Sequence, residues 1–139
     1  MMDWTDCIKK KIVKEIKIDL DLIESLIKTS NNKIQSEEKL IIDDSTSSSK
    51  ISLAYDSLRE LLEALAINKG YKIYNHECYT HFLKEILNES AKGDEFDELR
   101  RIRNSINYYG KDISIQESKK VLERIKNLRT EISDLLGEE

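Results

Sequence analysis

The chain contains no proline and only four glycines among its 139 residues. Proline lacks the backbone N–H and clashes with the preceding helical turn, and glycine has a high entropic cost in a helix, so both interrupt helices. Apolar residues recur every three or four positions over long stretches, with abundant Leu, Ile, Lys and Glu between them. This pattern predicts long amphipathic helices, and the length suits a single domain built around one core.

Apolar spacing and capping residues define the elements that we expect. The predicted helices cover about residues 5–28, 49–69, 75–88, 94–110 and 114–137, and the last of them opens on a capping box at residues 114–117. No segment has a convincing strand signal, and residues 43–50 read as a polar surface loop. The predicted fold is therefore all-α: one domain, residues 1–139, forming an antiparallel up-and-down bundle of four long helices plus one shorter helix.

Net charge and cysteine content limit the class of protein. The formal net charge is −4, so a globally basic nucleic-acid-coating protein is excluded, whereas a local basic patch is compatible with this value. Cys7 and Cys78 are too few and too far apart to predict a disulfide framework, and we expect two reduced thiols. No apolar run reaches the length of a membrane span, and the first residues do not resemble a signal peptide. The expected location is the cytoplasm, without membrane contact.

Residues 76–81 are the only segment with ligands that suit a transition metal. His76, Cys78 and His81 lie close in sequence, and zinc accepts both residue types. A structural zinc site needs four ligands, however, and no second His or Cys pair is present. The sequence also lacks a glycine-rich phosphate loop. We therefore expect no metal and no cofactor.

The end of the predicted fourth helix concentrates groups that can bind an anion. Arg100, Arg103, Asn104, Asn107 and Tyr108 fall on one side of a helical wheel. The other side carries apolar residues: Leu99, Ile102, Ile106 and Tyr109. Guanidinium groups offer planar forks that fit phosphate and carboxylate, so the band is a candidate binding surface. The alternative is an ordinary solvated helix face, whose arginines complement the helix dipole near its C-terminus.

Residues 103–108, Arg-Asn-Ser-Ile-Asn-Tyr, resemble the signature of HEPN domains, in which arginine and a polar residue are followed four to six positions after the arginine by histidine. Residues 54–65 with Gly70 resemble the second long helix of that family. His76, which opens the next predicted helix, has a counterpart in many members. The resemblance extends over residues 52–136.

The resemblance implies a helical homodimer in which two copies of the motif helix meet at a cleft. In active members that cleft is a metal-independent endoribonuclease site, and many members are toxins encoded beside a minimal nucleotidyltransferase antitoxin. Carried over to this chain, Arg103 would bind or polarise the scissile phosphate, and Asn104 would orient it. Arg100 and Asn107 would add phosphate contacts. Tyr108 stands at the catalytic position that histidine usually occupies.

Tyr108 is the departure from the family pattern. A free tyrosine titrates near 10 and a free histidine near 6.5, so tyrosine is a poor general base at neutral pH. The sequence thus predicts an RNA- or nucleotide-binding protein with weak or no endoribonuclease activity, unless the fold brings His76 or His81 into the cleft. The alternative is a non-catalytic helical protein-interaction module whose arginine band contacts an acidic partner. A band inside a cleft favours the first hypothesis, and a band on an outer convex face favours the second.

Overall fold

The computed structural model describes residues 2–110 and 112–137, without the side chain of Tyr109. In chain order the elements are α1 (Trp4–Lys9), β1 (Val13–Glu15), α2 (Leu20–Lys39), α3 (Ser47–Asn68), β2 (Tyr71–Ile73), α4 (Glu77–His81), the π-helical segment η1 (Phe82–Ile86), α5 (Ser90–Tyr109) and α6 (Ile115–Leu136). Most of the chain is helical, so the prediction of a predominantly α-helical protein is confirmed.

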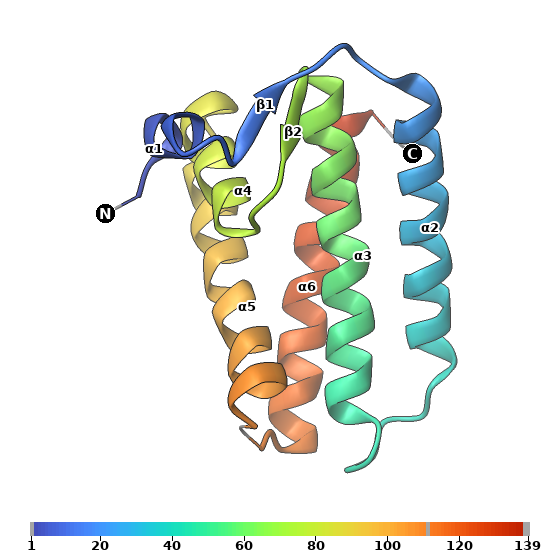
Figure 1. Cartoon of the computed structure of the whole chain (residues 1–139). Coiled ribbons are helices and arrows are strands. Elements are labelled where there is room, and N and C mark those ends of the chain that lie inside the picture. Colours follow the sequence, from blue (N-terminus) through green and yellow to red (C-terminus); the bar gives the residue numbers. More distant parts are fainter. Residues whose placement is uncertain (1, 111, 138–139) are drawn as a thin grey trace.

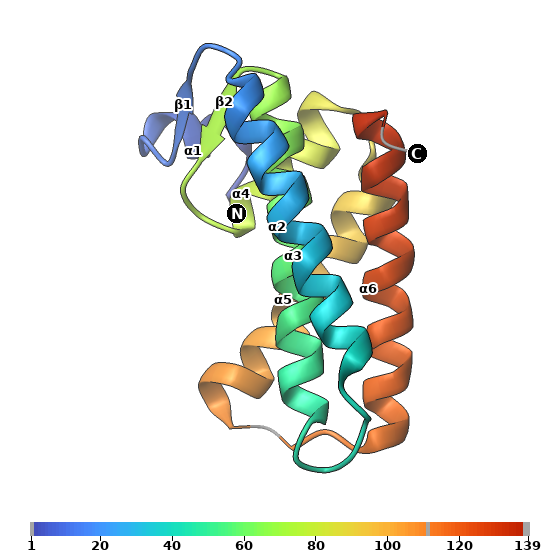
Figure 2. The same cartoon turned by 90° about the vertical axis from the view of Figure 1, so that its right-hand side faces the viewer.

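The long helices α2, α3, α5 and α6 lie side by side, and each runs opposite to the one before it (Figures 1 and 2). Helix α3 is central and packs against α2, α6 and α5. The smaller elements α1, β1, β2 and α4 gather at one end of the bundle. At the other end of the bundle, the last turns of α5 stand out to one side, as Figure 2 shows.

Helix α3 is central because it is apolar on most of its circumference. Leu58, Leu62 and Leu65 are fully buried, and the alanines at 54, 64 and 66 allow neighbouring helices to approach closely. The helix is followed by Gly70, whose φ of +89° lies in the left-handed region that glycine adopts without strain. The predicted helix end at Gly70 is thus confirmed.

The predicted helix over residues 5–28 is wrong. Helix α1 ends at Lys9, Lys11 adopts a φ of +60°, and β1 pairs in antiparallel register with β2. The helical spacing of isoleucines in this segment is compatible with a strand as well, because β-branched residues favour extended backbone when a partner strand is present. Asp19 caps α2 by accepting from the Leu22 N–H at 3.1 Å, and α2 then continues well past residue 28.

Two predicted boundaries between loop and helix also differ from those in the structure. Residues 47–50 belong to α3, so the predicted loop at 43–50 is shorter, and the Lys50 side chain is buried. Helix α5 begins at Ser90, four residues before the predicted start. Gly93 lies inside it, where a Cβ would come within 3.0 Å of the Thr80 carbonyl oxygen. This glycine permits close packing of α5 on α4 and does not mark a loop. The helix start at Ser114 is confirmed, because its hydroxyl accepts from the Glu117 N–H at 3.0 Å, but the Glu117 carboxylate accepts from that same hydroxyl, so only one half of the predicted capping box forms.

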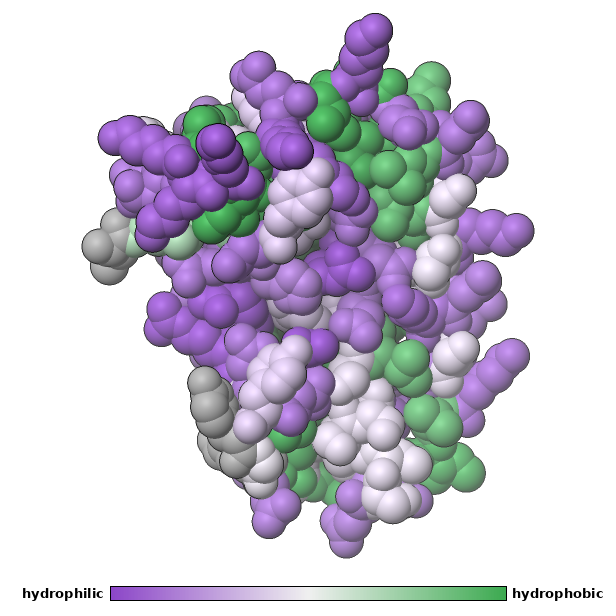
Figure 3. Space-filling model, viewed as in Figure 1, coloured by the Kyte–Doolittle hydropathy of each residue, from purple (hydrophilic) through white to green (hydrophobic). Residues whose placement is uncertain are grey.

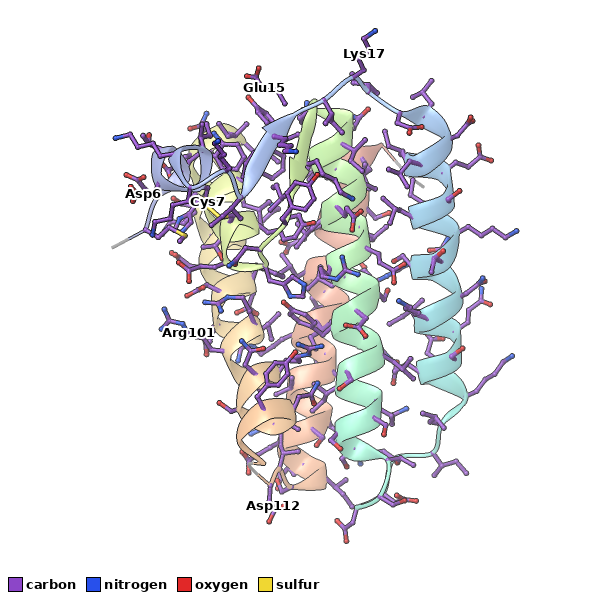
Figure 4. The ribbon with its side chains drawn as sticks, in the orientation of Figure 1. Asp6, Cys7, Glu15, Lys17, Arg101 and Asp112 are labelled. Atoms are coloured by element: carbon purple, nitrogen blue, oxygen red, sulfur yellow. A yellow bond between two sulfur atoms is a disulfide. The ribbon has the colours of Figure 1, made fainter. Side chains whose placement is uncertain are left out.

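The expectation of two free thiols is wrong, because Cys7 and Cys78 form a disulfide between α1 and α4 (Figure 4). Their Cα atoms lie 6.2 Å apart although 71 positions separate them in sequence. The β1–β2 pairing that brings the two segments together was not visible in the sequence pattern. None of the described helices is long and apolar enough to cross a membrane.

Candidate functional site

Arg103 projects from α5 toward α3, and its guanidinium lies between two aromatic rings. The guanidinium carbon is 5.1 Å from the centroid of the Tyr55 ring and 5.4 Å from that of Tyr108. One terminal nitrogen donates to the Tyr108 hydroxyl at 3.1 Å, and the other lies 3.7 Å from the Asp56 carboxylate. The side chain is only 14% exposed. Cation–π contacts and a distant carboxylate hold this arginine in place.

Tyr55 connects Arg103 to His76. Its hydroxyl and the Nδ1 atom of His76 are 3.1 Å apart, and the two ring centroids are 5.9 Å apart. Helix α3 supplies Tyr55, α5 supplies Arg103, and the turn before α4 supplies His76. We call Tyr55, Asp56, His76, Arg103 and Tyr108 the arginine–tyrosine cluster.

Burial and positive charge set the protonation states in this cluster. Burial, followed by the charges of Arg59 and Arg103, lowers the pKa of His76 to about 4, so its imidazole is neutral at pH 7. Burial raises the pKa of Tyr55, which therefore remains protonated. When this hydroxyl donates to Nδ1 of His76, the imidazole proton is on Nε2. In that tautomer His76 offers a hydrogen-bond donor.

One arginine of the cluster and one beside it have a donor without an acceptor in the described part of the chain. The Nε atoms of Arg100 and Arg103 are buried and find no hydrogen-bond partner among the described residues. Buried donors are normally paired, because an unpaired one costs about 1–3 kcal/mol. An arginine with a free donor and a carboxylate no closer than 3.7 Å has capacity left for an anion.

The structure brings together some of the predicted site residues and separates others. Arg103 and Tyr108 are in contact, and Asn104 is half-buried one position further along the same helix. Arg100 is directed to Asp97, with a nitrogen–oxygen distance of 2.8 Å. The Asn107 amide oxygen accepts from the Ser52 hydroxyl at 3.1 Å. Arg100 and Asn107 thus have protein partners, and the side chain of Tyr109 lies outside the described residues.

The two histidines are in different surroundings. His76 belongs to the arginine–tyrosine cluster, whereas His81 lies 3.6 Å from a carboxylate oxygen of Glu77 and 3.8 Å from one of Glu85. Glu85 also accepts from the Trp4 N–H, so this second histidine is close to α1. Within residues 2–110 and 112–137, no three His, Cys, Asp or Glu side chains are placed to hold a metal ion.

Tyr55 and Asp56 are site residues that the sequence pattern did not identify. From the sequence pattern, Tyr55 is interpreted as one more residue on the apolar core face of α3, and Asp56 as a solvated charge beside it. Their proximity to Arg103 arises from the packing of α3 on α5, two helices that are far apart in sequence. The resemblance of residues 54–65 to a family helix was the one available signal.

A separate cavity of about 390 Å³ lies between α5 and α6, on a different side of α5 from Arg103. Ile102, Ile106 and Val121 contribute apolar surface to it, and Arg101 and Lys120 are among its charged lining residues. The apolar stripe of α5 is therefore only partly covered by α6. The arginine–tyrosine cluster is not part of this cavity.

No family model matches this chain, and no curated protein sequence matches it. The resemblance to HEPN domains therefore rests on residues 103–108, on residues 54–65 and on the order of the helices.

Proposed function

We propose that this protein is a HEPN-like homodimer that binds RNA or a nucleotide, with Arg103 as the phosphate-binding residue. The observation that supports the proposal is the contact of Arg103 and His76 with the same ring, Tyr55. The fold thereby brings the family-like arginine beside a histidine, although Tyr108 occupies the usual position of the histidine. The terminal nitrogen of Arg103 that donates to the Tyr108 hydroxyl is the group from which a phosphate would accept.

The exposed Tyr108 covers Arg103 from outside. Its side chain is 68% exposed, and its hydroxyl accepts from the guanidinium. Rotation of this side chain about its χ1 bond would uncover the guanidinium without moving the backbone. A phosphate group would then replace the phenol as the hydrogen-bond acceptor. Asn104 and Asn107 lie close enough along α5 to orient the ligand once it is bound.

Any ribonuclease activity should be weak. Metal-independent RNA cleavage needs a base that takes the proton of the 2′-hydroxyl, and a phenol is a poor base at neutral pH. His76 is neutral, but in the tautomer with the proton on Nε2 its acceptor atom, Nδ1, already accepts from the Tyr55 hydroxyl, so no free basic nitrogen remains to take a proton. The proposed activity is therefore binding, with a toxin–antitoxin or nucleotidyltransferase-linked role and a nucleotidyltransferase as the partner protein.

A protein-interaction module with an outward arginine band is less well supported. The side chains of Arg100 and Arg103 are only 15% and 14% exposed, and both are directed toward neighbouring protein groups. An acidic protein surface would find few accessible guanidinium groups here. This alternative becomes the better hypothesis if the protein binds neither RNA nor a nucleotide.

Arg103→Ala tests the proposal, and Arg101→Ala is its matched control. Arg101 lies two positions earlier on α5, is 73% exposed and points away from the bundle (Figure 4). We expect Arg103→Ala to weaken binding of a fluorescent oligouridylate by about 1.5–3 kcal/mol, the scale of a hydrogen bond to a charged group. Arg101→Ala should change binding by less than about 0.5 kcal/mol. Equal losses in the two variants, measured by fluorescence anisotropy, would contradict a specific role of Arg103.

Tyr108→His tests the assignment of the proton-transfer position. Histidine at residue 108 would titrate near neutral pH and lie beside Arg103. We expect this variant to cleave RNA faster than the unmodified protein in a gel assay, with chelator present in both reactions. An unmodified protein that cleaves RNA as fast as the variant would show that another residue transfers the proton.

A further inference from the structure

Six exposed lysines gather where α1, the β1–β2 ladder and the end of α3 meet. This lysine patch consists of Lys9, Lys10, Lys11, Lys14, Lys17 and Lys69. None of the six forms an ion pair with a described residue, whereas lysines elsewhere do so repeatedly. Residues 9–17 carry five lysines and one carboxylate, Glu15, in a chain whose net charge is −4, and Asp3, Asp6 and Asp19 flank this stretch in the sequence. Figure 3 shows hydrophilic side chains over α1 and β1, and Figure 4 shows Lys17 pointing away from the molecule.

The short ladder fixes the arrangement of these lysines. Val13 and Ile73 are opposite each other in the register and are buried, so the next pair, Lys14 and Lys72, faces outward. The Ile16 N–H donates to the Gly70 carbonyl at 2.8 Å, which brings the neighbouring Lys17 and Lys69 close together. Lys72 is paired with Glu63 at 2.8 Å, whereas Lys14 forms no ion pair with a described residue, so Lys14 is the member of the outward-facing pair that adds an uncompensated charge to the patch.

An exposed aromatic ring lies among these lysines. Tyr74 directly follows β2 and is 59% exposed, and the Lys14 ammonium is 6.0 Å from the centroid of its ring. Proteins that bind single-stranded nucleic acid combine positive charge along the backbone with aromatic rings on which bases stack. Tyr74 precedes His76 of the arginine–tyrosine cluster by two residues, so the two surfaces are joined by a very short piece of chain.

We infer that the lysine patch binds the phosphate backbone of a single-stranded RNA that also reaches Arg103. This inference rests on the proposed function and narrows it, because it selects an RNA strand over a mononucleotide. A mononucleotide carries its phosphate at one point and can occupy only the arginine–tyrosine cluster. A strand can place phosphates on the lysines and a base on Tyr74 at the same time.

The test compares two fourfold variants that remove the same charge. The patch variant replaces Lys9, Lys10, Lys14 and Lys17 with Gln, leaving Lys11 intact because of its left-handed backbone. The control variant replaces four other exposed lysines, none of them ion-paired with a described residue: Lys28, Lys39, Lys119 and Lys120. Both should keep the thermal unfolding midpoint of the unmodified protein, because these side chains are exposed.

Binding is measured by fluorescence anisotropy with an oligouridylate of about 15 nucleotides, the upper site size of one small binding domain. We expect the patch variant to bind at least about tenfold more weakly at low salt and to lower the slope of log affinity against log salt by about 2 to 3, since each lysine contributes about 0.7 on a single strand. The control variant should bind within about twofold of the unmodified protein, because its lysines lie outside the patch. Uridine monophosphate should bind equally to all three proteins.

Each contrary result has a distinct meaning. Equal losses in the patch and control variants would overturn the inference, because net charge alone would then explain binding. Binding of phosphatidylserine vesicles, lost in the patch variant, without any binding of the oligouridylate would assign the patch to a membrane surface and overturn it as well. A failure of the proposed function gives a different pattern. Arg103→Ala then binds the oligouridylate as tightly as the unmodified protein, while the patch variant still loses affinity.

Tyr74→Leu tests the aromatic contact without changing the charge of the protein. We expect about a tenfold loss of oligouridylate affinity with an unchanged salt slope, because stacking contributes about 1–3 kcal/mol per base. Unchanged affinity would remove the aromatic contact from the inferred strand path.

Discussion

Two charged clusters of this protein differ in how completely their charges are compensated. The glutamate clasp, formed by Glu37, Lys50 and Lys126, joins α2 to α3 and α6. Glu37 is 1% exposed, and its two carboxylate oxygens lie 2.8 Å from the Lys50 ammonium and 2.6 Å from that of Lys126. Lys50 also donates to the backbone carbonyls of Glu37 and Leu40 at the end of α2. Each ammonium thus has a carboxylate oxygen within 2.8 Å, although one carboxylate serves two ammonium groups and Glu37 Oε1 makes no hydrogen bond of normal geometry with a described residue.

The arginine–tyrosine cluster is compensated far less. The carboxylate nearest to the Arg103 guanidinium is 3.7 Å away, aromatic rings flank it, and its Nε has no partner among the described residues. Both clusters contain cations that are largely covered by protein. In the glutamate clasp each cation has a carboxylate oxygen within 2.8 Å, whereas the carboxylate nearest to Arg103 is 3.7 Å away. The difference indicates that the glutamate clasp holds helices together, whereas the arginine–tyrosine cluster retains capacity for an external anion.

The largest effect should come from breaking the glutamate clasp. We expect Glu37→Gln to lower the free energy of unfolding by about 3–5 kcal/mol, because it leaves the buried Lys50 ammonium without its counter-charge. Urea denaturation followed by circular dichroism measures this loss. RNA binding by the fraction that remains folded should not change. A loss below about 1 kcal/mol would mean that the clasp is no more structural than an exposed ion pair.

His76 should give a smaller effect that depends on pH. Its pKa is about 4 in the folded protein and near 6.5 when unfolded, so between these values the unfolded chain binds more protons. Its contribution to stability is therefore complete above about pH 6.5 and is lost as the pH falls toward 4. Because the ring is only partly buried, we expect about 1–2 kcal/mol of pH-dependent stability.

The measurement compares unfolding of the unmodified protein and His76→Gln at pH 7.5 and pH 4.5. The variant lacks the titrating group and should lose less stability over this interval. In Arg103→Ala the histidine pKa, followed by NMR, should rise toward its usual value because a positive neighbour is removed. An NMR midpoint near 6.5 in the unmodified protein would show that the cluster does not perturb this histidine.

Asp56→Asn should have the smallest effect on stability. Its effect on RNA binding should be opposite to that of Arg103→Ala. The carboxylate is partly exposed and distant from Arg103, so its removal should change the free energy of unfolding by less than about 1 kcal/mol. Phosphate would no longer compete with it for the guanidinium, and oligouridylate binding should tighten by up to about 1 kcal/mol. Weaker binding in this variant would indicate that Asp56 orients Arg103 and does not compete with the ligand.

The sequence predicted what depends on local spacing. The apolar face of α3, its end at Gly70 and the N-cap at Ser114 were all predicted from neighbouring residues. The strand at residues 13–15 was missed because β-branched residues adopt helix or strand according to their partner, and that partner is almost 60 positions away. The disulfide between Cys7 and Cys78 depends on the same long-range pairing.

The candidate site shows the same limit. Arg103 and Tyr108 belong to one helix but lie about 140° apart around it, so their contact depends on the reach of two long side chains and was not given by helical spacing alone. The contact of Arg103 with Tyr55, and of Tyr55 with His76, depends on the packing of three segments. The lysines at 9–17 are adjacent in the sequence, but their exposure and the nearby Lys69 become evident only after the β1–β2 ladder has formed.

The disulfide between Cys7 and Cys78 gives the molecule an uneven response to mechanical force. When the chain is pulled by its two ends, the covalent loop from residue 7 to residue 78 is bypassed, and α2 and α3 bear no tension along the backbone. At about 3.5 Å per extended residue, the oxidised protein should lengthen to roughly 240 Å, compared with about 490 Å after reduction. Arg103 lies on the part that extends, and Tyr55 lies inside the loop. Stretching therefore pulls the two halves of the arginine–tyrosine cluster apart while the helix that carries Tyr55 bears no load.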